Sequence, residues 1–335
     1  MTATATAPSG ADLATLFAPL GEQCYTPARC DALADTIAEI QDLKRARNAV
    51  VLAHNYQRPE LFRVADFVGD SLELARQAAR VDADVIVFCG VHFMAETAKI
   101  LNPARTVILP DLRAGCSLAD SVTAEDLAAR RAELRRVYPD LAVVCYVNTT
   151  ADVKAECDVC CTSSNAVRIV EALPSEHVLF VPDRNLAAYV QSQTTKTIIA
   201  WDGNCYVHHQ ITPEQIGAVR AALPGLEILV HPECRADVLS LADAVLSTSG
   251  MVRYAKESPA HAFLIVTECG LSDRLMLEVP EKRFYKSCKL CQYMKMITLE
   301  GTRDALRDLR PEITLPEDVR VRAARALERM LELGG

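Results

Sequence analysis

The stretch that decides the fold is Val50–Tyr56, VVLAHNY, a short β-branched run that ends in polar residues. Two further runs share this pattern, AVVCYVN at 142–148 and EILVHPE at 227–233. An amphipathic segment precedes each run, at residues 30–48, 123–140 and 212–225. Alternation of apolar runs with amphipathic segments indicates βα units that build a mostly parallel sheet.

The three runs belong to an internal repeat. Aligned on the strand ends His54, Tyr146 and His231, each copy has an aspartate twelve residues later, and these are Asp66, Asp158 and Asp243. Seventeen residues after the strand end, each copy has a hydroxyl side chain, and these are Ser71, Ser163 and Thr248. A second apolar strand follows in each copy, at 85–90, 178–183 and 263–269. Self-similarity at a nearly fixed period is the signature of repeated structural units.

The repeat predicts the fold class and the domains. We expect an α/β protein of three related αβα sandwich domains, with short parallel sheets arranged around a pseudo-threefold axis. The expected segments are a partly loose N-terminal extension at 1–30, α/β repeats at 31–122, 123–211 and 212–300, and a C-terminal helical tail at 301–335. The first twenty residues are expected to be disordered or loosely docked, and the tail to pack on the third domain.

Composition limits the class of protein. The 335 residues carry a net charge of -8, which argues against nucleic acid or an anionic membrane as the main partner. No apolar run is long enough to span a bilayer, and the first residues lack the pattern of a signal peptide. A cytoplasmic location is therefore expected. In that reducing compartment, thirteen cysteines indicate thiols, metal ligands or catalysis rather than a disulfide framework.

Only one aligned column is cysteine in all three copies. It holds Cys116, Cys205 and Cys291, each in a loop beyond the second strand. The segment CDVCC at 157–161 has the spacing of a metal motif, but the other two copies have small apolar residues in those columns. We therefore expect the cysteines of CDVCC to be packing residues, because free cysteine behaves as a small hydrophobe.

Three thiolates, one from each domain, suit an iron–sulfur cluster. A four-iron cluster with three protein ligands has one open iron, which can act as a Lewis acid. Two alternatives stay open from the residues alone. The three cysteines could be unrelated loop residues, or they could bind zinc with His208 or His209 as the fourth ligand.

Polar residues gather where the first strands end. Functional groups in open α/β sheets collect at the carboxyl ends of the strands, and buried polar groups there indicate a ligand. The residues concerned are His54, Tyr56, Tyr146, Asn148, His231 and Glu233. The aligned hydroxyl residues could form anion sites at helix N-termini, or they could be simple N-caps. Glu233 or Tyr56 could serve as a general acid or base. No phosphate-binding loop or dinucleotide fingerprint is present.

Nine motifs in order resemble the quinolinate synthase family over about residues 35 to 300. They are VLAHNYQRPE, VGDSLELA, FMAETAKILNP, YVNTTADVKA, TSSNAV, PDRNLA, VHPEC, STSGM and CQYMKMITLE. The resemblance implies three α/β sandwich domains around a pseudo-threefold axis. It also implies a transferase of de novo NAD biosynthesis that condenses iminoaspartate with dihydroxyacetone phosphate to quinolinate, with loss of phosphate and two waters.

The resemblance also assigns site residues. A [4Fe-4S] cluster would be bound by Cys116, Cys205 and Cys291, with its open iron acting as Lewis acid. The catalytic positions match Tyr56, Glu233 and His208. The substrate-binding positions match His54, Ser71, Tyr146, Asn148, Ser163, His208, His231, Glu233 and Thr248. L-aspartate oxidase or an aspartate dehydrogenase would supply the labile iminoaspartate, and a homodimer is one option for the assembly.

The chain departs from the family at one motif. Some members have C-x-x-C-x-x-C near the C-terminus, whereas Tyr285 occupies the first position here and leaves Cys288 and Cys291. We expect Cys291 to be the ligand and Cys288 to be a bystander, with a redox role for Cys288 as the alternative. Two other functions would use a related cluster, an aconitase-like hydro-lyase and a non-enzymatic iron–sulfur carrier or sensor.

Overall fold

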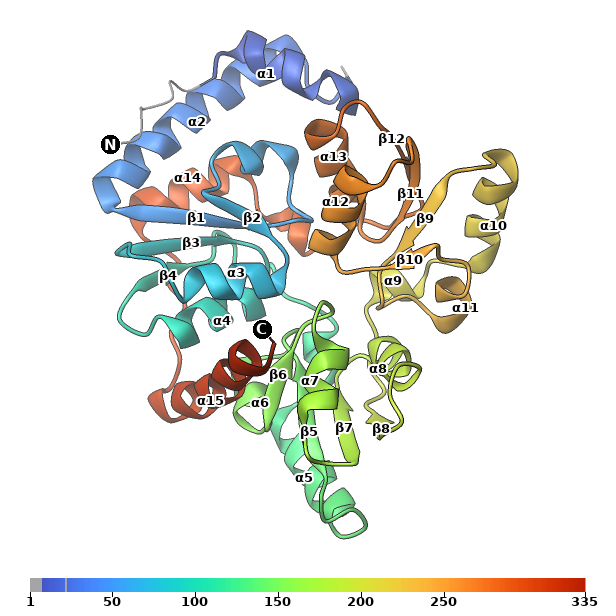
Figure 1. Ribbon diagram of the computed structural model, residues 1–335. Coiled ribbons are helices and arrows are strands. Elements are labelled where there is room, and N and C mark those ends of the chain that lie inside the picture. Colours follow the sequence, from blue (N-terminus) through green and yellow to red (C-terminus); the bar gives the residue numbers. More distant parts are fainter. Residues whose placement is uncertain (1–7, 22, 335) are drawn as a thin grey trace.

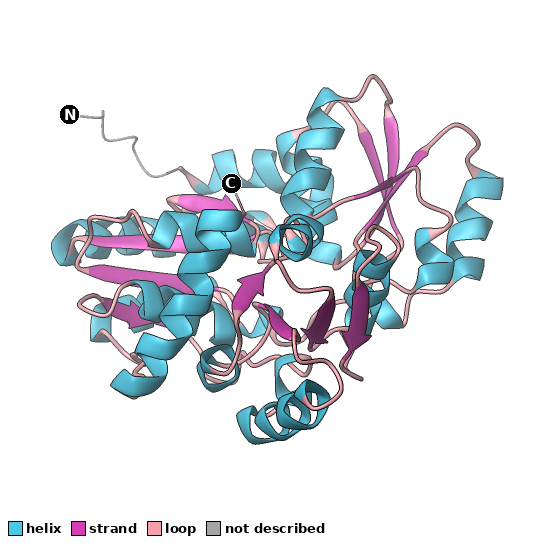
Figure 2. Cartoon of the chain, turned by 60° about the horizontal axis from the view of Figure 1, so that its bottom comes forward, coloured by secondary structure: helices cyan, strands magenta, loops and turns pink. Residues whose placement is uncertain are grey.

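Three parallel four-stranded sheets form the framework of the molecule (Figure 1). The computed structural model describes residues 8–21 and 23–334. The strand order is the same in each sheet, namely β2-β1-β3-β4, β6-β5-β7-β8 and β10-β9-β11-β12. Figure 2 shows helices on the outside of all three groups of strands. The predicted fold class, three related αβα units with short parallel sheets, is confirmed. The boundaries between the predicted domains stay predictions.

The first unit contains the strand that opens the repeat. Helix α2 begins after Thr26, whose side chain caps the helix, with Pro27 at its first position. It ends at Asn48, which adopts the left-handed conformation (φ 46°) and turns the chain into β1. The elements are α1 (Gly10–Phe17), α2 (Pro27–Arg47), β1 (Ala49–His54), β2 (Phe67–Gly69), α3 (Ser71–Ala78), β3 (Val85–Cys89), α4 (His92–Leu101) and β4 (Thr106–Ile108).

The second unit repeats this order. Its first helix is capped by Thr123, which accepts a hydrogen bond from the backbone N–H of Asp126. The elements are α5 (Ala124–Arg135), β5 (Ala142–Tyr146), α6 (Ala151–Ala155), β6 (Val159–Cys161), α7 (Ala166–Ala172), β7 (His177–Val181), α8 (Arg184–Gln191) and β8 (Thr197–Ala200). Cys160 and Cys161 lie in β6 and are fully buried, so the prediction that they are packing residues is confirmed.

The third unit starts with a capping box at Thr212, followed by Pro213 at the first helical position. The short helix α9 (Tyr206–His209), which ends the second unit, precedes Thr212. The elements of the third unit are α10 (Pro213–Ala222), β9 (Glu227–Val230), α11 (Ala236–Leu239), β10 (Ala244–Val245), α12 (Thr248–Glu257), β11 (Ala262–Val266), α13 (Cys269–Glu278) and β12 (Arg283–Lys286). A second, small apolar core lies in this unit, separate from the large core that joins all three units.

The aligned aspartates explain why the repeat has a fixed register. Each carboxylate accepts a hydrogen bond of 2.8 Å from a backbone N–H of the first strand. Each also forms an ion pair with a cation of the preceding helix, at 2.8, 3.4 and 3.2 Å. The three sets are Val51–Asp66–Lys44, Val143–Asp158–Arg135 and Ile228–Asp243–Arg220. In every unit, one aspartate therefore connects the first helix, the first strand and the start of the next strand along the chain, which is β2, β6 or β10.

The C-terminal tail packs elsewhere than expected. Helix α14 (Leu299–Asp308) contacts α2 of the first unit, and α15 (Glu317–Leu333) contacts α6 and β6 of the second unit (Figure 1). Arg322 of α15 forms an ion pair with Glu156 at 2.6 Å. The expectation that the tail packs on the third domain was wrong. Helix α6 has only five residues, so the β6 side of the second sheet needs the apolar face of α15 to cover it.

The described part of the N-terminal extension is docked rather than loose. Helix α1 packs on α2, where Leu13 and Phe17 are fully buried and the Phe17 ring lies 4.4 Å from the Tyr25 ring. Residues 1–7 and 22, which also belong to the expected loose segment, lie outside the described residues. Within residues 8–21 and 23–334, no helix combines the length and the hydropathy needed to cross a bilayer.

Candidate active site

One cavity lies where the carboxyl ends of the three sheets meet, with about 640 Å³ of empty space that is partly open to solvent. Every site residue predicted from the sequence lines it. These residues are His54, Tyr56, Ser71, Cys116, Tyr146, Asn148, Ser163, Cys205, His208, His231, Glu233, Thr248 and Cys291. The structure thus brings the whole predicted set together, while the role of each residue stays a prediction.

The strand ends deliver their polar side chains in equivalent ways. His54 and Tyr146 are the last residues of β1 and β5, and His231 directly follows β9. In the first and third units, the histidine Nδ1 accepts a hydrogen bond from the backbone N–H two residues later, at 3.2 Å from Tyr56 and 3.4 Å from Glu233. This bond fixes the ring. In a neutral ring the proton is then on Nε2.

Burial keeps these two histidines neutral. It disfavours the charged form and lowers the pKa of both His54 and His231 to about 3. Both rings are therefore uncharged at neutral pH. Each can donate one hydrogen bond from Nε2 to an acceptor such as a carboxylate or a phosphate.

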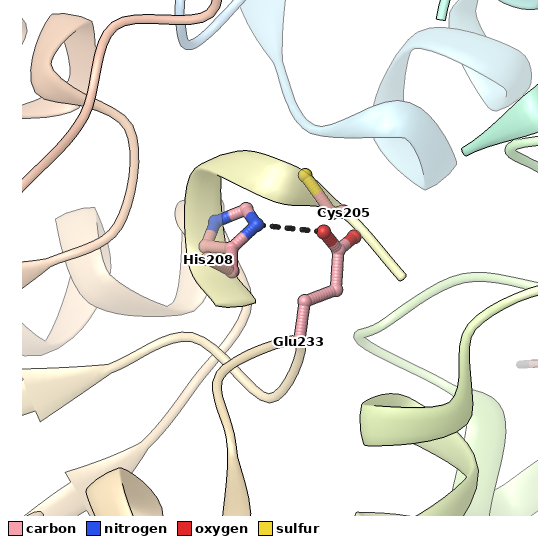
Figure 3. A group of neighbouring side chains, drawn as sticks. All are labelled: Cys205, His208 and Glu233. Carbon is pink, nitrogen blue, oxygen red and sulfur yellow. Dashed lines mark ion pairs between the residues drawn. The ribbon is translucent and has the colours of Figure 1, made fainter. Parts of the chain in front are cut away.

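A chain of contacts links side chains of all three units across the cavity. His208 Nδ1 lies 2.7 Å from Glu233 Oε2 (Figure 3), an ion-pair contact that is poorly aligned for a hydrogen bond. His208 Nε2 lies 2.9 Å from Thr267 Oγ1, and that hydroxyl lies 2.5 Å from the Tyr56 hydroxyl. We call Glu233, His208, Thr267 and Tyr56 the relay. Such a row of groups can hold or pass a proton.

The Glu233 carboxylate is stabilised in its charged form. Burial alone would raise its pKa, but electrostatic attraction to the neighbouring His208 and the hydrogen bond from Tyr146 lower the pKa to about 2. The Tyr146 hydroxyl donates a short hydrogen bond to Glu233 Oε1. Burial in turn raises the pKa values of Tyr56 and Tyr146. The site thus contains a carboxylate and two phenols that keep their protons.

The aligned hydroxyl residues are not N-caps. The cap of α3 is Asp70 and the cap of α12 is Ser247, so Ser71 and Thr248 are the first residues inside their helices. Ser163 lies in a turn before α7, so it does not stand at a helix start as expected. Asp70 and Ser247 cap α3 and α12, and the N-cap position of α7 is Asn165, without a side-chain cap, so none of the three aligned hydroxyl residues is an N-cap. Their hydroxyls line the cavity.

The three aligned cysteines reach the cavity from three loops. Cys116 follows β4, Cys205 precedes α9, and Cys291 follows β12. All three line the same cavity. Burial raises the pKa of Cys116 to about 12 and also raises the pKa values of Cys205 and Cys291. A metal must therefore displace a proton from each thiol. Three soft ligands without a fourth cysteine on the described lining fit a three-ligand cluster.

A second metal-like group overlaps this one. Ligand atoms of Cys205, His208 and Glu233 all lie within 4.8 Å of one another, and Figure 3 shows the thiol above the facing imidazole and carboxylate. Both nitrogens of His208, however, already contact Glu233 or Thr267. His209 is absent from the cavity lining, since its ring nitrogens lie 3.2–3.3 Å from Asn185 and Arg184. The two histidines that the sequence could not distinguish are thus separated.

Cys288 is bonded rather than a bystander. It forms a disulfide with Cys269, with 5.1 Å between the two Cα atoms. The bond ties the start of α13 to the loop that carries Cys291. The expectation of free thiols throughout was therefore wrong for this pair, while the other eleven cysteines are free. The geometry allows the bond because the N-terminus of α13 lies beside that loop.

Three polar residues at the site were missed. Thr267 connects His208 to Tyr56, and the buried carboxylates Asp70 and Glu268 lie on the cavity lining. Thr267 and Glu268 directly follow β11, at a strand end that the repeat had already marked. Asp70 directly precedes an aligned hydroxyl residue. Their positions at a strand end or helix start could have indicated these three residues. None of them has the same residue type at the equivalent position in all three copies.

Comparison with known proteins gives a consistent result. The family model described as quinolinate synthetase A protein matches residues 38–332. A quinolinate synthase of Desulforudis audaxviator is 53% identical over 302 residues, covering 89% of this chain and 98% of the relative. Quinolinate synthase 1 of Methanosarcina acetivorans is 52% identical over 300 residues, covering 89% and 97%. Quinolinate synthase 2 of Mesorhizobium japonicum is 52% identical over 311 residues, covering 92% and 95%.

Proposed function

The chain belongs to the quinolinate synthetase A family, and we propose that it condenses iminoaspartate with dihydroxyacetone phosphate to quinolinate, releasing phosphate and two waters. This transferase step belongs to NAD biosynthesis, and the proposed location is cytoplasmic. The observation that carries the proposal is the single cavity lined by three thiols, one per unit, together with the complete polar set that the family resemblance assigns.

We infer that Cys116, Cys205 and Cys291 hold a [4Fe-4S] cluster. When bound, the cluster supplies an iron with an open coordination position that can polarise an oxygen or nitrogen of the substrate. The protein supplies three thiolates from three loops, so the cluster fits only when all three units are in place. The ring of His208 is committed to Glu233 and Thr267, which favours the cluster over a zinc site completed by that histidine.

The remaining polar groups suit a dianionic substrate. His54 and His231 each present one Nε2–H donor, and Ser71, Ser163 and Thr248 present hydroxyls from three directions. The Asn148 side chain has a buried Oδ1 without a hydrogen-bond partner among the described residues, as expected where an N–H or O–H of the ligand donates to it. These groups would hold two carboxylates, and at first a phosphate, without placing a cation in the cavity wall.

Proton transfer falls to the relay. Loss of two waters and tautomerisation of an imine require protons to be added to leaving hydroxyls and removed from carbon. The Tyr56 hydroxyl keeps its proton and can donate it to a leaving hydroxyl, and a proton from His208 Nε2 can replace it through the Thr267 hydroxyl. The ionised Glu233 carboxylate lies beside His208 Nδ1 and can accept a proton. Tyr146 holds the other oxygen of Glu233, which orients the carboxylate.

Removing an anion-binding hydroxyl should weaken substrate binding. We expect Ser71→Ala and Thr248→Ala to raise KM roughly 10- to 150-fold, with a smaller change in kcat, because one lost hydrogen bond to a charged group costs about 1.5–3 kcal/mol. Steady-state kinetics at matched iron content measure this. Ser240→Ala is the control, since the exposed Ser240 hydroxyl donates to the backbone oxygen of Asp237 and Ser240 is absent from the cavity lining. An unchanged KM in both variants would remove these hydroxyls from the binding site.

The proposed function is tested by anaerobic turnover. Purified protein with about four irons per chain should form quinolinate when L-aspartate oxidase or an aspartate dehydrogenase generates iminoaspartate in the presence of dihydroxyacetone phosphate. Omission of either substrate is the control. A bound cluster without turnover would instead support an iron–sulfur carrier, and turnover of a hydroxy acid alone would support a hydro-lyase of the aconitase type.

A further inference from the structure

The three cysteine loops are anchored to the sheets in the same way. In each unit one helix directly follows the strand β3, β7 or β11, and these helices are α4, α8 and α13. The backbone N–H of the first residue of this helix donates a hydrogen bond to the backbone oxygen of the residue two positions before the cysteine. The pairs are His92 to Ala114 at 2.7 Å, Arg184 to Gly203 at 2.8 Å and Cys269 to Lys289 at 3.4 Å. The backbone therefore holds the three loops with threefold similarity.

Two of the three loops have an additional side-chain anchor. Asp183, the N-cap of α8, accepts the backbone N–H of Leu186 on Oδ1 and that of Cys205 on Oδ2, at 2.8 and 3.2 Å. Glu268, the N-cap of α13, accepts the N–H of Gly270 on Oε2 and that of Cys291 on Oε1, at 2.6 and 3.0 Å. Each acid thus gives one oxygen to its helix and the other to a cluster cysteine.

The third loop lacks this anchor. Val91, Asp183 and Glu268 lie two residues beyond the ends of β3, β7 and β11, respectively, so they occupy equivalent positions. Val91 caps α4 without a side-chain hydrogen bond. Within residues 8–21 and 23–334, no side-chain acceptor is recorded for the backbone N–H of Cys116. The backbone hydrogen bonds to the three cysteine loops are therefore equivalent in all three units, whereas only two of the loops are also held by an acidic side chain.

Helix capping alone does not account for these acids. Serine, threonine or asparagine would cap either helix about as well and without a buried charge. Asp183 and Glu268 are both fully buried, where a carboxylate is costly unless both oxygens are satisfied. In each case the cysteine amide donates to the second oxygen, and Glu268 Oε1 also has an ion pair of 3.2 Å with Lys295 Nζ. The side chain is therefore matched to the ligand loop as well as to the helix.

We propose that Asp183 and Glu268 are positioning residues for the cluster ligands Cys205 and Cys291, and that the Cys116 corner has no such residue. This rests on the proposed function, because it assumes that the three thiolates bind a cluster. By holding the amide N–H of the ligand, each acid fixes the loop and keeps that N–H from the sulfur. Hydrogen bonds to cluster sulfurs help to set the reduction potential, so the acids also influence the potential.

The test uses Asp183→Asn and Glu268→Gln in the full chain, loaded anaerobically with iron and sulfide. In the amide an NH2 group replaces one of the two carboxylate oxygens, so a donor faces one of the two backbone N–H groups and that hydrogen bond is lost. We expect iron loss to an added chelator to be roughly 10- to 100-fold faster than in the wild type, as for other outer-shell partners of metal ligands. We also expect a more positive midpoint potential, because the released amide can donate to sulfur.

Asp140→Asn is the matched control. Asp140 also accepts two backbone N–H groups, those of Glu176 and His177, but it lies on the exposed side of the second unit. This variant should lose iron at the wild-type rate. If Asp183→Asn does not fold, Asp183→Ser is used to test the positioning role. Serine can cap α8, but its single hydroxyl oxygen leaves the backbone N–H of Cys205 without the acceptor that Asp183 provides. Circular dichroism establishes folding in each case.

The outcomes separate this proposal from the proposed function. A wild type with about four irons, and variants with the same rate of iron loss and the same potential, would overturn the positioning role alone. A folded Asp183→Ser that keeps its cluster as firmly as the wild type would do the same. A wild type that binds no cluster after reconstitution would overturn both. Faster iron loss with a shifted potential, in the acid variants only, supports the positioning role.

Discussion

Replacing any one of Cys116, Cys205 or Cys291 with alanine is expected to remove most of the bound iron and reduce quinolinate formation to background. Each residue is the only cysteine that its unit contributes to the described lining of the cavity, so no neighbouring thiol can replace it. Two protein ligands hold a cluster poorly, because thiolates are the ligands that bind its irons. Iron and sulfide analysis after anaerobic reconstitution measures the loss, and turnover follows from the same samples.

Cys160→Ala is the control for this experiment. Cys160 is fully buried in β6, in register with Cys145 on β5, and lies outside the cavity lining. Its replacement should cost some stability, about 1 kcal/mol for a small core truncation, but leave the iron content unchanged. A cavity variant that keeps four irons and wild-type turnover, or a Cys160 variant that loses its cluster, would contradict the assignment of ligands.

The second large effect is expected at the relay. Glu233→Gln should lower kcat about 10²- to 10⁴-fold with little change in KM, which is the range for loss of general acid–base catalysis. Thr267→Val should lower kcat in the same direction, because it removes the hydroxyl that lies between His208 Nε2 and the Tyr56 hydroxyl. Steady-state kinetics on cluster-loaded protein measure both, with iron content determined on each sample.

Thr267→Ser is the control for the relay. Serine keeps the hydroxyl and removes only a methyl group, so its kcat should lie close to the wild-type value. If Thr267→Val is as active as Thr267→Ser, the hydroxyl has no part in proton transfer. A large rise in KM without a fall in kcat would instead place Glu233 and Thr267 in substrate binding.

The repeat made the fold and the cavity predictable. Strand ends such as His54, Tyr146 and His231 could be aligned without a gap, because the aspartate twelve residues later fixes the distance from strand to strand in each copy. Parallel strands bring their carboxyl ends to one edge. Three equivalent edges facing one another therefore place the polar residues at the strand ends and the aligned hydroxyl residues on one cavity.

The residues that were missed have no repeated signal. Thr267 aligns with Gly90 and Pro182, so its column differs in every copy, and its partners Tyr56 and His208 belong to other parts of the chain. The contact exists only after the three units assemble. The Cys269–Cys288 disulfide was missed because an expectation based on cellular compartment contains no information on which loops become neighbours.

The position of the C-terminal helix α15 depends on a sheet face in the second unit that the short helix α6 leaves uncovered. Its apolar face was readable from the sequence, and Leu327 and Met330 are buried as an amphipathic helix predicts. Its partner was not readable, since α15 packs on the second unit, where α6 is short, and not on the third unit that precedes it in the chain. Sequence proximity was the wrong guide, because helices pack where a sheet face is uncovered.

The central claim is that three thiolates from three units hold one cluster and leave one iron for the substrate. The most direct measurement is an anaerobic Mössbauer spectrum of ⁵⁷Fe-loaded protein, recorded without ligand and with dihydroxyacetone phosphate or quinolinate. One iron site of the cluster should change on ligand addition while the other three stay the same. Spectra in which all sites or none respond, or in which no cluster forms, would contradict the claim.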